Sequence, residues 1–309
     1  MNKSEFSKKL RDLINSGDNI SLADFCTKYK RNIIPDKLYK YAPFSCYAVD
    51  NLLNSQLYLN SPRNFNDPFD CWYFKSQSTR SIMLDIIQKA MDICADDASL
   101  ETFLKQTSSQ AQENKKITDE DIDKLIDNLK RGIESSKRGN SHYDIVNKAL
   151  ERVRIVCLSE YHPSNLLMWS HYADYHKGLC FEYDFRNCNS TTLDMLYPVI
   201  YQEQSKVSTV KYNKNSPEDF QSRELLKTVL FKSWEWIYEQ EWRLIDIQRE
   251  ANDNGITHKI PLPTRIYIGV YANDEDKINA ILNFACLNGI SVSKMSRNDD
   301  SFLLSDNSI

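Results

Sequence analysis

The stretch LYKYAPFSCYAVDNLLNSQLYLNS, residues 38–61, carries two strand-like segments on either side of a short helical one. Residues 37–41 and residues 57–61 (LYLNS) suit strands, and residues 46–55 between them suit a short helix. The turn-rich segment PRNFNDPFD follows at once. We therefore expect the folded core to open with a strand, a helix, a second strand and a polar loop.

On the amino-terminal side, residues 4–16 place Phe6, Leu10, Leu13 and Ile14 on one helical stripe. A second helix through Tyr29 follows, so residues 1–34 are predicted to form a helical leader. On the other side, residues 78–150 have helical apolar spacing and few strand formers. This segment is predicted to be a helical insertion within the core.

Strand-like segments return after the insertion. We expect strands at residues 154–160, 179–185, 197–202, 238–248, 265–272, 290–295 and 301–305, and helices at 218–234 and 274–289. Runs of strands mixed with a few helices are typical of α+β proteins. The sequence predicts one α+β domain over residues 1–309, with a mixed, mostly antiparallel sheet.

Composition bears on several classes of protein. The net charge of the 309 residues is −4, so the chain has no overall positive charge of the kind that indicates nucleic-acid binding. With seven glycines, the chain contains no Gly-rich phosphate loop. Its eight cysteines show no zinc-ligand spacing, and no apolar run is long enough to span a membrane. We expect a soluble, cytoplasmic protein with reduced cysteines and no membrane partner; the sequence does not indicate its oligomeric state.

The loop FNDPFD, residues 65–70, has strong turn chemistry because Asx side chains bond to the backbone just ahead of them. One interpretation is a rigid loop anchored by Phe65 and Phe69. The other is a loop that presents Asn66 and Asp67 to a cleft. The sequence leaves both open.

The segment MWSHYADYHKG, residues 168–178, gathers aromatic rings and imidazoles. His171 and His176 are five residues apart, a poor spacing for two metal ligands on one helix. Trp169, His171 and Tyr172 suit stacking on a planar ring and hydrogen bonding to sugar hydroxyls. A buried aromatic cluster is the equally weighted alternative.

The segment WEWIYEQEWRLI, residues 234–245, is predicted to be part of a strand. Alternate residues of a strand share a face, so Glu239, Glu241 and Arg243 would point the same way. Two adjacent like charges cost stability unless something compensates them. Either Arg243 completes a structural Glu–Arg ladder, or the two carboxylates face a substrate.

Together these motifs resemble a widespread bacterial domain of unknown function. The resemblance rests on LYKY, FNDPFD, MWSHYADYHKG followed by CFEYD, and the segment from Lys232 to Arg243, and it covers roughly residues 35–305. The order of strand, helix, strand and a late strand with Glu-Gln-Glu is also similar to the ADP-ribosyltransferase fold.

This second resemblance implies that NAD is the substrate and that no metal is required. It implies that Lys40, Tyr39 or Tyr41 holds the NAD, and that Tyr172 or His171 holds the nicotinamide. Glu241 would be the catalytic carboxylate, with Glu239 two residues before it. The implied activity is ADP-ribosyl transfer to a protein or nucleic acid, or NAD hydrolysis, as in a toxin or an anti-phage defence effector.

Two other functions remain open. One is a metal-dependent nuclease or hydrolase that uses Asp67, Asp70, Glu239, Glu241 and His171, although the histidine spacing argues against a metal. The other is a module that binds a nucleotide without chemistry.

Overall fold

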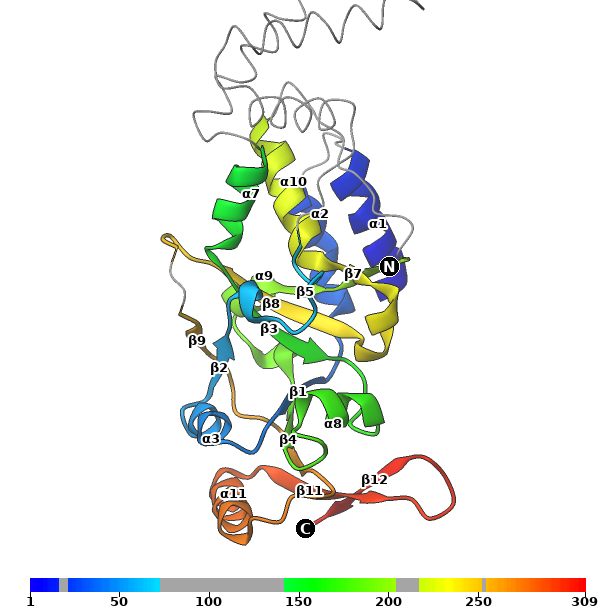
Figure 1. Cartoon of the computed structure of the whole chain (residues 1–309), viewed down its shortest axis with the longest axis vertical. Coiled ribbons are helices and arrows are strands. Elements are labelled where there is room, and N and C mark those ends of the chain that lie inside the picture. Colours follow the sequence, from blue (N-terminus) through cyan, green and yellow to red (C-terminus); the bar gives the residue numbers. More distant parts are fainter. Residues whose placement is uncertain (17–21, 73–141, 204–216, 252–253) are drawn as a thin grey trace, which may run out of the picture. The chain divides into compact units, whose positions relative to one another are not determined.

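The computed structural model describes residues 1–16, 22–72, 142–203, 217–251 and 254–309 (Figure 1). The chain divides into two compact units, one of residues 1–72 with 149–309 and one of residues 73–148. The predicted helical insertion falls mostly outside the described residues; its last part forms helix α7, His142–Leu150. The expectation of a single domain stays a prediction. Apart from residues 142–148, the described residues all belong to the first unit.

An eight-stranded sheet forms the centre of this unit. Its strands, in spatial order, are β12 (Leu304–Ser308), β11 (Ser291–Arg297), β10 (Arg265–Ile268), β4 (Leu179–Tyr183), β1 (Leu38–Ala42), β3 (Val153–Ser159), β8 (Glu241–Ile247) and β5 (Leu196–Pro198). β10 and β11 run parallel, and the other neighbours run antiparallel. The prediction of an α+β fold with a mixed, mostly antiparallel sheet is confirmed.

Helices and short elements surround the sheet. The α-helices of this unit are α1 (Lys3–Ser16), α2 (Leu22–Tyr29), α3 (Cys46–Leu53), α8 (Leu166–Tyr172), α9 (Ser190–Met195), α10 (Pro217–Leu230) and α11 (Glu275–Asn288). The 3₁₀ helices are η1 (Lys30–Ile33), η2 (Pro62–Asn64), η3 (Phe185–Asn187) and η4 (Trp234–Glu239). Two small sheets pair β2 (Gln56–Leu59) with β9 (Ile256–Lys259), and β6 (Ile200–Gln202) with β7 (Phe231–Ser233).

The amino-terminal helix α1, predicted as part of a helical leader, packs into the main hydrophobic core. Its stripe of Phe6, Leu10, Leu13 and Ile14 is at most 1% exposed and belongs to the main hydrophobic core. α1 lies beside α2 and α10 (Figure 1). The apolar stripe of α1 thus packs against α2, the next helix of the chain, and against α10, which is distant in sequence.

The predicted strand at 238–248 is wrong at its beginning. Residues 234–239 form the 3₁₀ helix η4, Gln240 adopts a left-handed conformation at φ 42°, and β8 begins at Glu241. The amide of Gln240 donates to the carbonyl of Ile237, which closes the turn. Glu239 is therefore not a strand neighbour of Glu241, and the shared strand face does not explain their proximity.

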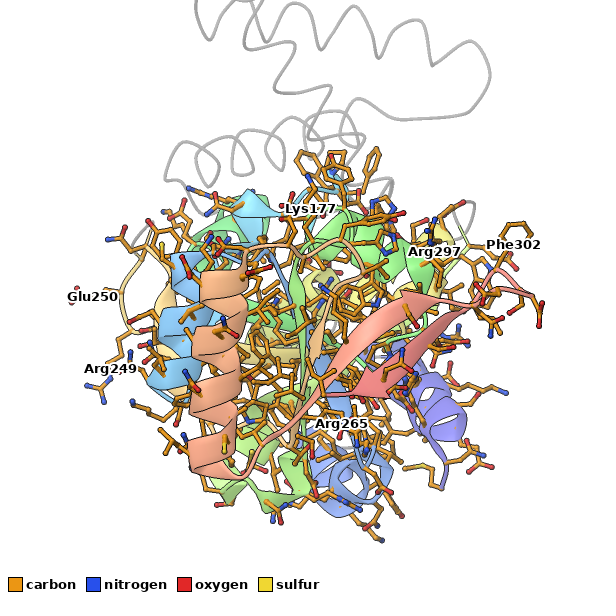
Figure 2. The ribbon with its side chains drawn as sticks, turned by 90° about the horizontal axis from the view of Figure 1, so that it is seen from below. Lys177, Arg249, Glu250, Arg265, Arg297 and Phe302 are labelled. Atoms are coloured by element: carbon orange, nitrogen blue, oxygen red, sulfur yellow. The ribbon has the colours of Figure 1, made fainter. Side chains whose placement is uncertain are left out.

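The carboxyl-terminal end of the unit is formed by α11, β11 and β12. Phe302, in the loop between the last two strands, is 96% exposed and points away from the sheet (Figure 2). Within the described part of the chain, no helix has the length and apolar character needed to cross a membrane. The seven cysteines that the structure describes are all free thiols.

Candidate functional site

The neighbouring strands β1 and β3 of the central sheet are paired at one end and separate along the rest of their length. β1 and β3 pair at one register position, where Tyr39 lies opposite Ser159. Further along, Asn60 forms two backbone hydrogen bonds with Ile155 of β3, each 2.9 Å long. A gap between β1 and β3 is therefore bounded at one end by the Tyr39–Ser159 pair and at the other by the Asn60–Ile155 bridge.

A cavity of about 490 Å³ lies in this gap. Residues 39–43 and residues 155–159 line it, as expected where two paired strands separate. α3 and β2 supply further lining residues, and α8 contributes Met168, His171 and Tyr172. The volume lies within the range of small-molecule binding sites.

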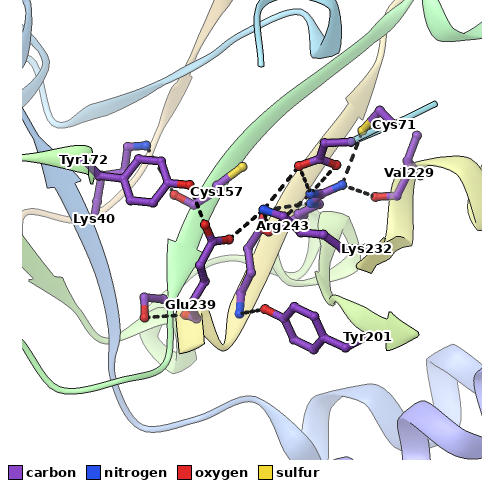
Figure 3. A network of polar contacts seen from close by, with 12 residues as sticks. Lys40, Cys71, Cys157, Tyr172, Tyr201, Val229, Lys232, Glu239 and Arg243 are labelled. Carbon is purple, nitrogen blue, oxygen red and sulfur yellow. Dashed lines mark hydrogen bonds and ion pairs between the residues drawn. The ribbon is translucent and has the colours of Figure 1, made fainter. Parts of the chain in front are cut away.

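A cluster of five charged side chains lies at the Ser159 end of the cavity. Figure 3 labels three of them, Lys232, Glu239 and Arg243. None of the five is more than 9% exposed. The loop after η2 supplies one carboxylate, β7 an ammonium, and η4 and β8 the rest. The members are Asp70, Lys232, Glu239, Glu241 and Arg243.

Lys232 joins the three carboxylates. Its Nζ lies 2.6 Å from Glu239 Oε2, 2.9 Å from Glu241 Oε2 and 3.3 Å from Asp70 Oδ2. Burial alone would lower the pKa of this ammonium, but Glu241 and Asp70 hold the pKa above its usual value. Lys232 therefore stays charged and acts as the central counter-ion.

Arg243 fixes the inner side of the cluster. Its Nη2 donates to both Asp70 carboxylate oxygens at 2.7 Å, and its Nε donates to Glu241 Oε1 at 2.8 Å. Its Nη1 donates to the carbonyl of Val229 at 2.8 Å. A planar fork of donors suits this arrangement, which a lysine would not reproduce.

The two glutamates differ in pKa. Burial raises the pKa of Glu241, but Arg243 and Lys232 outweigh it, so the pKa lies well below the usual value. Burial also raises the pKa of Glu239, and with Glu241 beside it the pKa is about 7 in spite of Lys232. Three carboxylates against two cations leave one negative charge in excess, and a proton on Glu239 removes it.

The environment of Glu239 is set by α8 and β3. The hydroxyl of Tyr172 donates to Glu239 Oε1 (Figure 3). Ser159 Oγ donates to the Glu239 carbonyl at 2.7 Å. Both Glu239 and Tyr172 line the cavity. Glu241 also borders the cavity, yet both of its oxygens contact Arg243 or Lys232.

Lys40 is the cation of β1 that extends across the gap. Its Nζ donates to the carbonyl of Cys157 on β3 at 3.3 Å, so it lies on the parted edge of that strand. Lys40 lines the cavity and is half-buried. The expected role of Lys40 in holding NAD stays a prediction.

The flanking tyrosines of β1 lie differently. Tyr39 and Tyr41 border the cavity, but their rings are buried in a second hydrophobic cluster. There Tyr41 meets Trp169 edge to face at 5.3 Å between ring centroids, and Tyr39 lies 6.3 Å from Tyr267. Residues two apart on a strand share a face, so Lys40 is the one of the three that faces the other way.

Trp169 is fully buried, and its Nε1 donates to the carbonyl of Pro163. It is not among the residues that line the cavity. Its ring packs edge to face against Tyr41 in the second hydrophobic cluster. For Trp169 this favours a role in a buried aromatic cluster over stacking on a ligand. His171, by contrast, lines the cavity and is exposed, beside Trp236 and Tyr238.

The FNDPFD loop contributes in a way that its motif did not predict. Asn66 lines the cavity, whereas Asp67 accepts a hydrogen bond from the Phe69 amide at 2.9 Å and is not among the lining residues. The loop's main contribution is Asp70, which Arg243 and Lys232 hold. The turn chemistry of Asp67 thus serves to place Asp70.

Sequence reasoning assigned no role to Lys232. The signal was present, because Lys232 precedes a Glu-x-Glu-x-Arg segment whose excess of buried acid needs a cation. Nor did it single out the side-chain amides of Asn51, Gln56, Asn60 and Asn64, which also line the cavity. Among the described residues, no group of three or more His, Cys, Asp or Glu side chains is arranged to hold a metal ion.

Fold and site define an α+β protein whose sheet is parted around a polar cavity with a buried charged cluster at one end. Residues 168–244 match the model of a family described as "Protein of unknown function (DUF2971)". This segment runs from α8 into β8 and includes Tyr172, Lys232, Glu239 and Arg243. The expected likeness to a domain of unknown function is thereby confirmed over this segment. No curated protein and no solved structure matches the chain.

Proposed function

We propose that the chain cleaves the nicotinamide–ribose bond of NAD, as an ADP-ribosyltransferase or an NAD glycohydrolase, with Glu239 as the working carboxylate. The proposal differs from the sequence-based expectation, which gave that role to Glu241. The observation that carries it is Glu239 itself: a carboxyl with a pKa of about 7 that lines the cavity between Tyr172 and Lys232.

The chemistry needs a carboxylate that can act on a developing cation. When the bond between the ribose carbon and the nicotinamide nitrogen breaks, nicotinamide leaves with the bonding electrons and positive charge develops on the ribose. An ionised Glu239 stabilises that charge more in the transition state than in the ground state. Water or an acceptor hydroxyl then bonds to the ribose carbon and gives its proton to Glu239, whose pKa suits this exchange near neutral pH.

Glu241 is better suited to a supporting role. Its pKa is depressed by Arg243 and Lys232, and both of its carboxylate oxygens are held by these two cations. Its negative charge keeps the Glu239 pKa raised, and it holds Arg243 beneath the cavity. In this proposal Glu241 positions the cluster, while Glu239 faces the ligand.

One observation favours a second candidate, a nucleotide-binding module without chemistry. Glu239 already has a counter-ion in Lys232 at 2.6 Å, which would have to give way before the carboxylate can stabilise a second cation. A metal-dependent hydrolase fits the donor set less well. A divalent ion at Asp70 and Glu241 would have to displace the buried cations Lys232 and Arg243.

The test is NAD consumption by the purified full-length chain, with release of nicotinamide as the readout. We expect Glu239→Gln to lower turnover by about a hundredfold or more, on the scale of a lost electrostatic contact in a transition state. Glu275→Gln, on the exposed first turn of α11, is the matched control and should leave turnover unchanged.

Two further variants test the roles of the residues around Glu239. Tyr172→Phe removes the hydrogen bond to Glu239 but keeps the ring, and should reduce turnover less than Glu239→Gln does. Glu241→Gln should lower folding stability, because it leaves part of the buried Arg243 charge unpaired. NAD binding without turnover in the wild-type chain would support the binding module and refute the proposed enzyme.

A further inference from the structure

The helix α3 presents two side chains to the end of the cavity opposite the charged cluster. Because β1 and β3 are antiparallel, the Ala42 end of β1, which leads into α3, lies toward the Ile155 end of β3. Tyr47 and Asn51 are four residues apart, share one helical face and line the cavity.

Local packing fixes the orientation of this helix. Ser45 caps it by accepting a hydrogen bond from the Ala48 amide, and Ala48 and Leu52 are buried beneath it. The ring of Tyr47 stays 78% exposed although it borders the cavity. An exposed, well-anchored aromatic ring beside a cavity offers a flat surface on which a planar group can stack.

Asn51 forms a hydrogen-bonded pair with a second carboxamide. Gln56, the first residue of β2, donates from Nε2 to Asn51 Oδ1 at 3.2 Å, and both residues line the cavity. Whichever way the two amides are turned, the pair retains one oxygen acceptor and one NH₂ donor for another molecule. An acceptor beside a donor is complementary to the edge of a nucleobase.

Charge separates the two ends of the cavity. The residues of α3 and β2 that line it are uncharged, among them Tyr47, Asn51 and Gln56. The other end is lined by three carboxylates and one ammonium, those of Asp70, Glu239, Glu241 and Lys232, so acid is in excess there. A neutral ring is favoured at the first end and a cationic ring at the second. Lys40, on the strand between them, offers a cation for an anionic linker.

We propose that Tyr47, Asn51 and Gln56 form a subsite for a purine base, adenine in the case of NAD, at the α3 end of the cavity. Tyr47 stacks on the base, and the Asn51–Gln56 pair binds its donor–acceptor edge. A nicotinamide ring carries a similar donor and acceptor, but its positive charge suits the acidic end. The orientation of a dinucleotide along the cavity rests on the proposed function; the base subsite itself does not.

The test measures the affinity of the full-length chain for adenosine monophosphate by titration calorimetry. Tyr47→Ala and Asn51→Leu should each weaken binding about tenfold or more, whereas Tyr47→Phe, which keeps the ring, should stay within about twofold of the wild type. Phe302→Ala is the control, because the Phe302 ring is 96% exposed and is not among the residues that line the cavity.

Nicotinamide mononucleotide is the second probe. Its affinity should change by less than about twofold in Tyr47→Ala, because its ring occupies the acidic end. The proposed subsite is overturned if adenosine monophosphate does not bind the wild-type chain, or if it binds all variants with the same affinity. Equal losses for both probes overturn its specificity for the purine. Adenosine monophosphate has no bond to nicotinamide, so this outcome is independent of whether the chain consumes NAD.

Discussion

At the scale of single residues, Glu239 and Glu241 are two positions apart in the sequence but have different hydrogen-bond partners and different pKa values. Glu241 contacts Arg243 through both carboxylate oxygens and stays ionised, whereas Glu239 meets a tyrosine hydroxyl and one shared ammonium. The cluster has one carboxylate more than it has cations, and Glu239 is the carboxylate whose pKa rises, to about 7. Like charges brought together in a buried site divide in this way because both cannot ionise without cost.

This division predicts how stability depends on pH. The carboxyl of Glu239 has a pKa of about 7 in the folded chain, against 4.5 for a free glutamate. Between these values the folded state binds more protons than the unfolded state, so the free energy of unfolding falls as pH rises. The stabilisation that comes from the raised pKa of Glu239 is fully present below pH 4.5 and is lost as pH rises through about 7. Between these values the free energy of unfolding changes by at most about 1.4 kcal/mol per pH unit.

Urea unfolding at about pH 5 and about pH 7 measures this slope. Glu239→Gln cannot titrate, so its stability relative to wild type should increase toward the higher pH. Glu275→Gln, which alters an exposed carboxylate, should keep the wild-type slope. Parallel curves for wild type and Glu239→Gln would contradict the assignment. Glu241, with its lowered pKa, contributes a slope of opposite sign that belongs to more acidic pH.

At the scale of elements, the site depends on where strands separate and how the flanking segments are held. The link from α8 to β4 places Asp174, Tyr175 and His176 in left-handed conformations, at φ 45°, 53° and 67°. The Gly178 amide then donates to the Ala173 carbonyl at 2.8 Å. This compact link fixes α8, and with it Tyr172, against the end of β1.

Gly178 is required by this close approach. A Cβ at this position would lie 2.3 Å from the carbonyl oxygen of Ala42, which lines the cavity. Because the neighbouring atoms are backbone, Gly178→Ala should cost about 1–3 kcal/mol of unfolding free energy or more. Gly289, which ends α11 at φ 67°, has no atom within 4 Å of the place that a Cβ would occupy, and asparagine tolerates that conformation. Gly289→Asn should therefore cost much less in the same urea titration, and equal losses would refute the steric explanation.

At the scale of the whole molecule, the first helix belongs to the main core. Leu10 is 1% exposed, in a cluster that includes residues from β3, β4 and β8. Leu10→Ala should lower the free energy of unfolding by about 2–5 kcal/mol, because it leaves a cavity in that core. Lys9→Ala, at an exposed neighbouring position, should change it by less than about 0.5 kcal/mol. A small effect of Leu10→Ala on urea unfolding would contradict the packing of α1 in the main core.

Local pattern predicted most of the elements correctly. The strands at β1, β3 and β4 and the helices α1, α3 and α11 lie within a few residues of their predicted ranges. The least accurate predictions concern short strands whose partner strand is distant in the sequence. The strand expected at 57–61 became β2, which pairs with β9 instead of the central sheet, and residues 197–202 divided into β5 and β6. Register and sheet membership are set by the partner strand, and a local pattern does not specify it.

The sequence by itself determined the α+β class, the helical stripe of α1, the turn at Asp67 and the concentration of acid near Glu239, because each depends on neighbours within a few residues. Tertiary structure decided the rest. It brought Asp70 and Lys232 to Glu241 and Arg243, turned Glu239 out of the strand, and parted β1 from β3. Charge balance and burial are properties of side chains gathered from distant segments, so the roles of the two glutamates became distinguishable only in the folded chain.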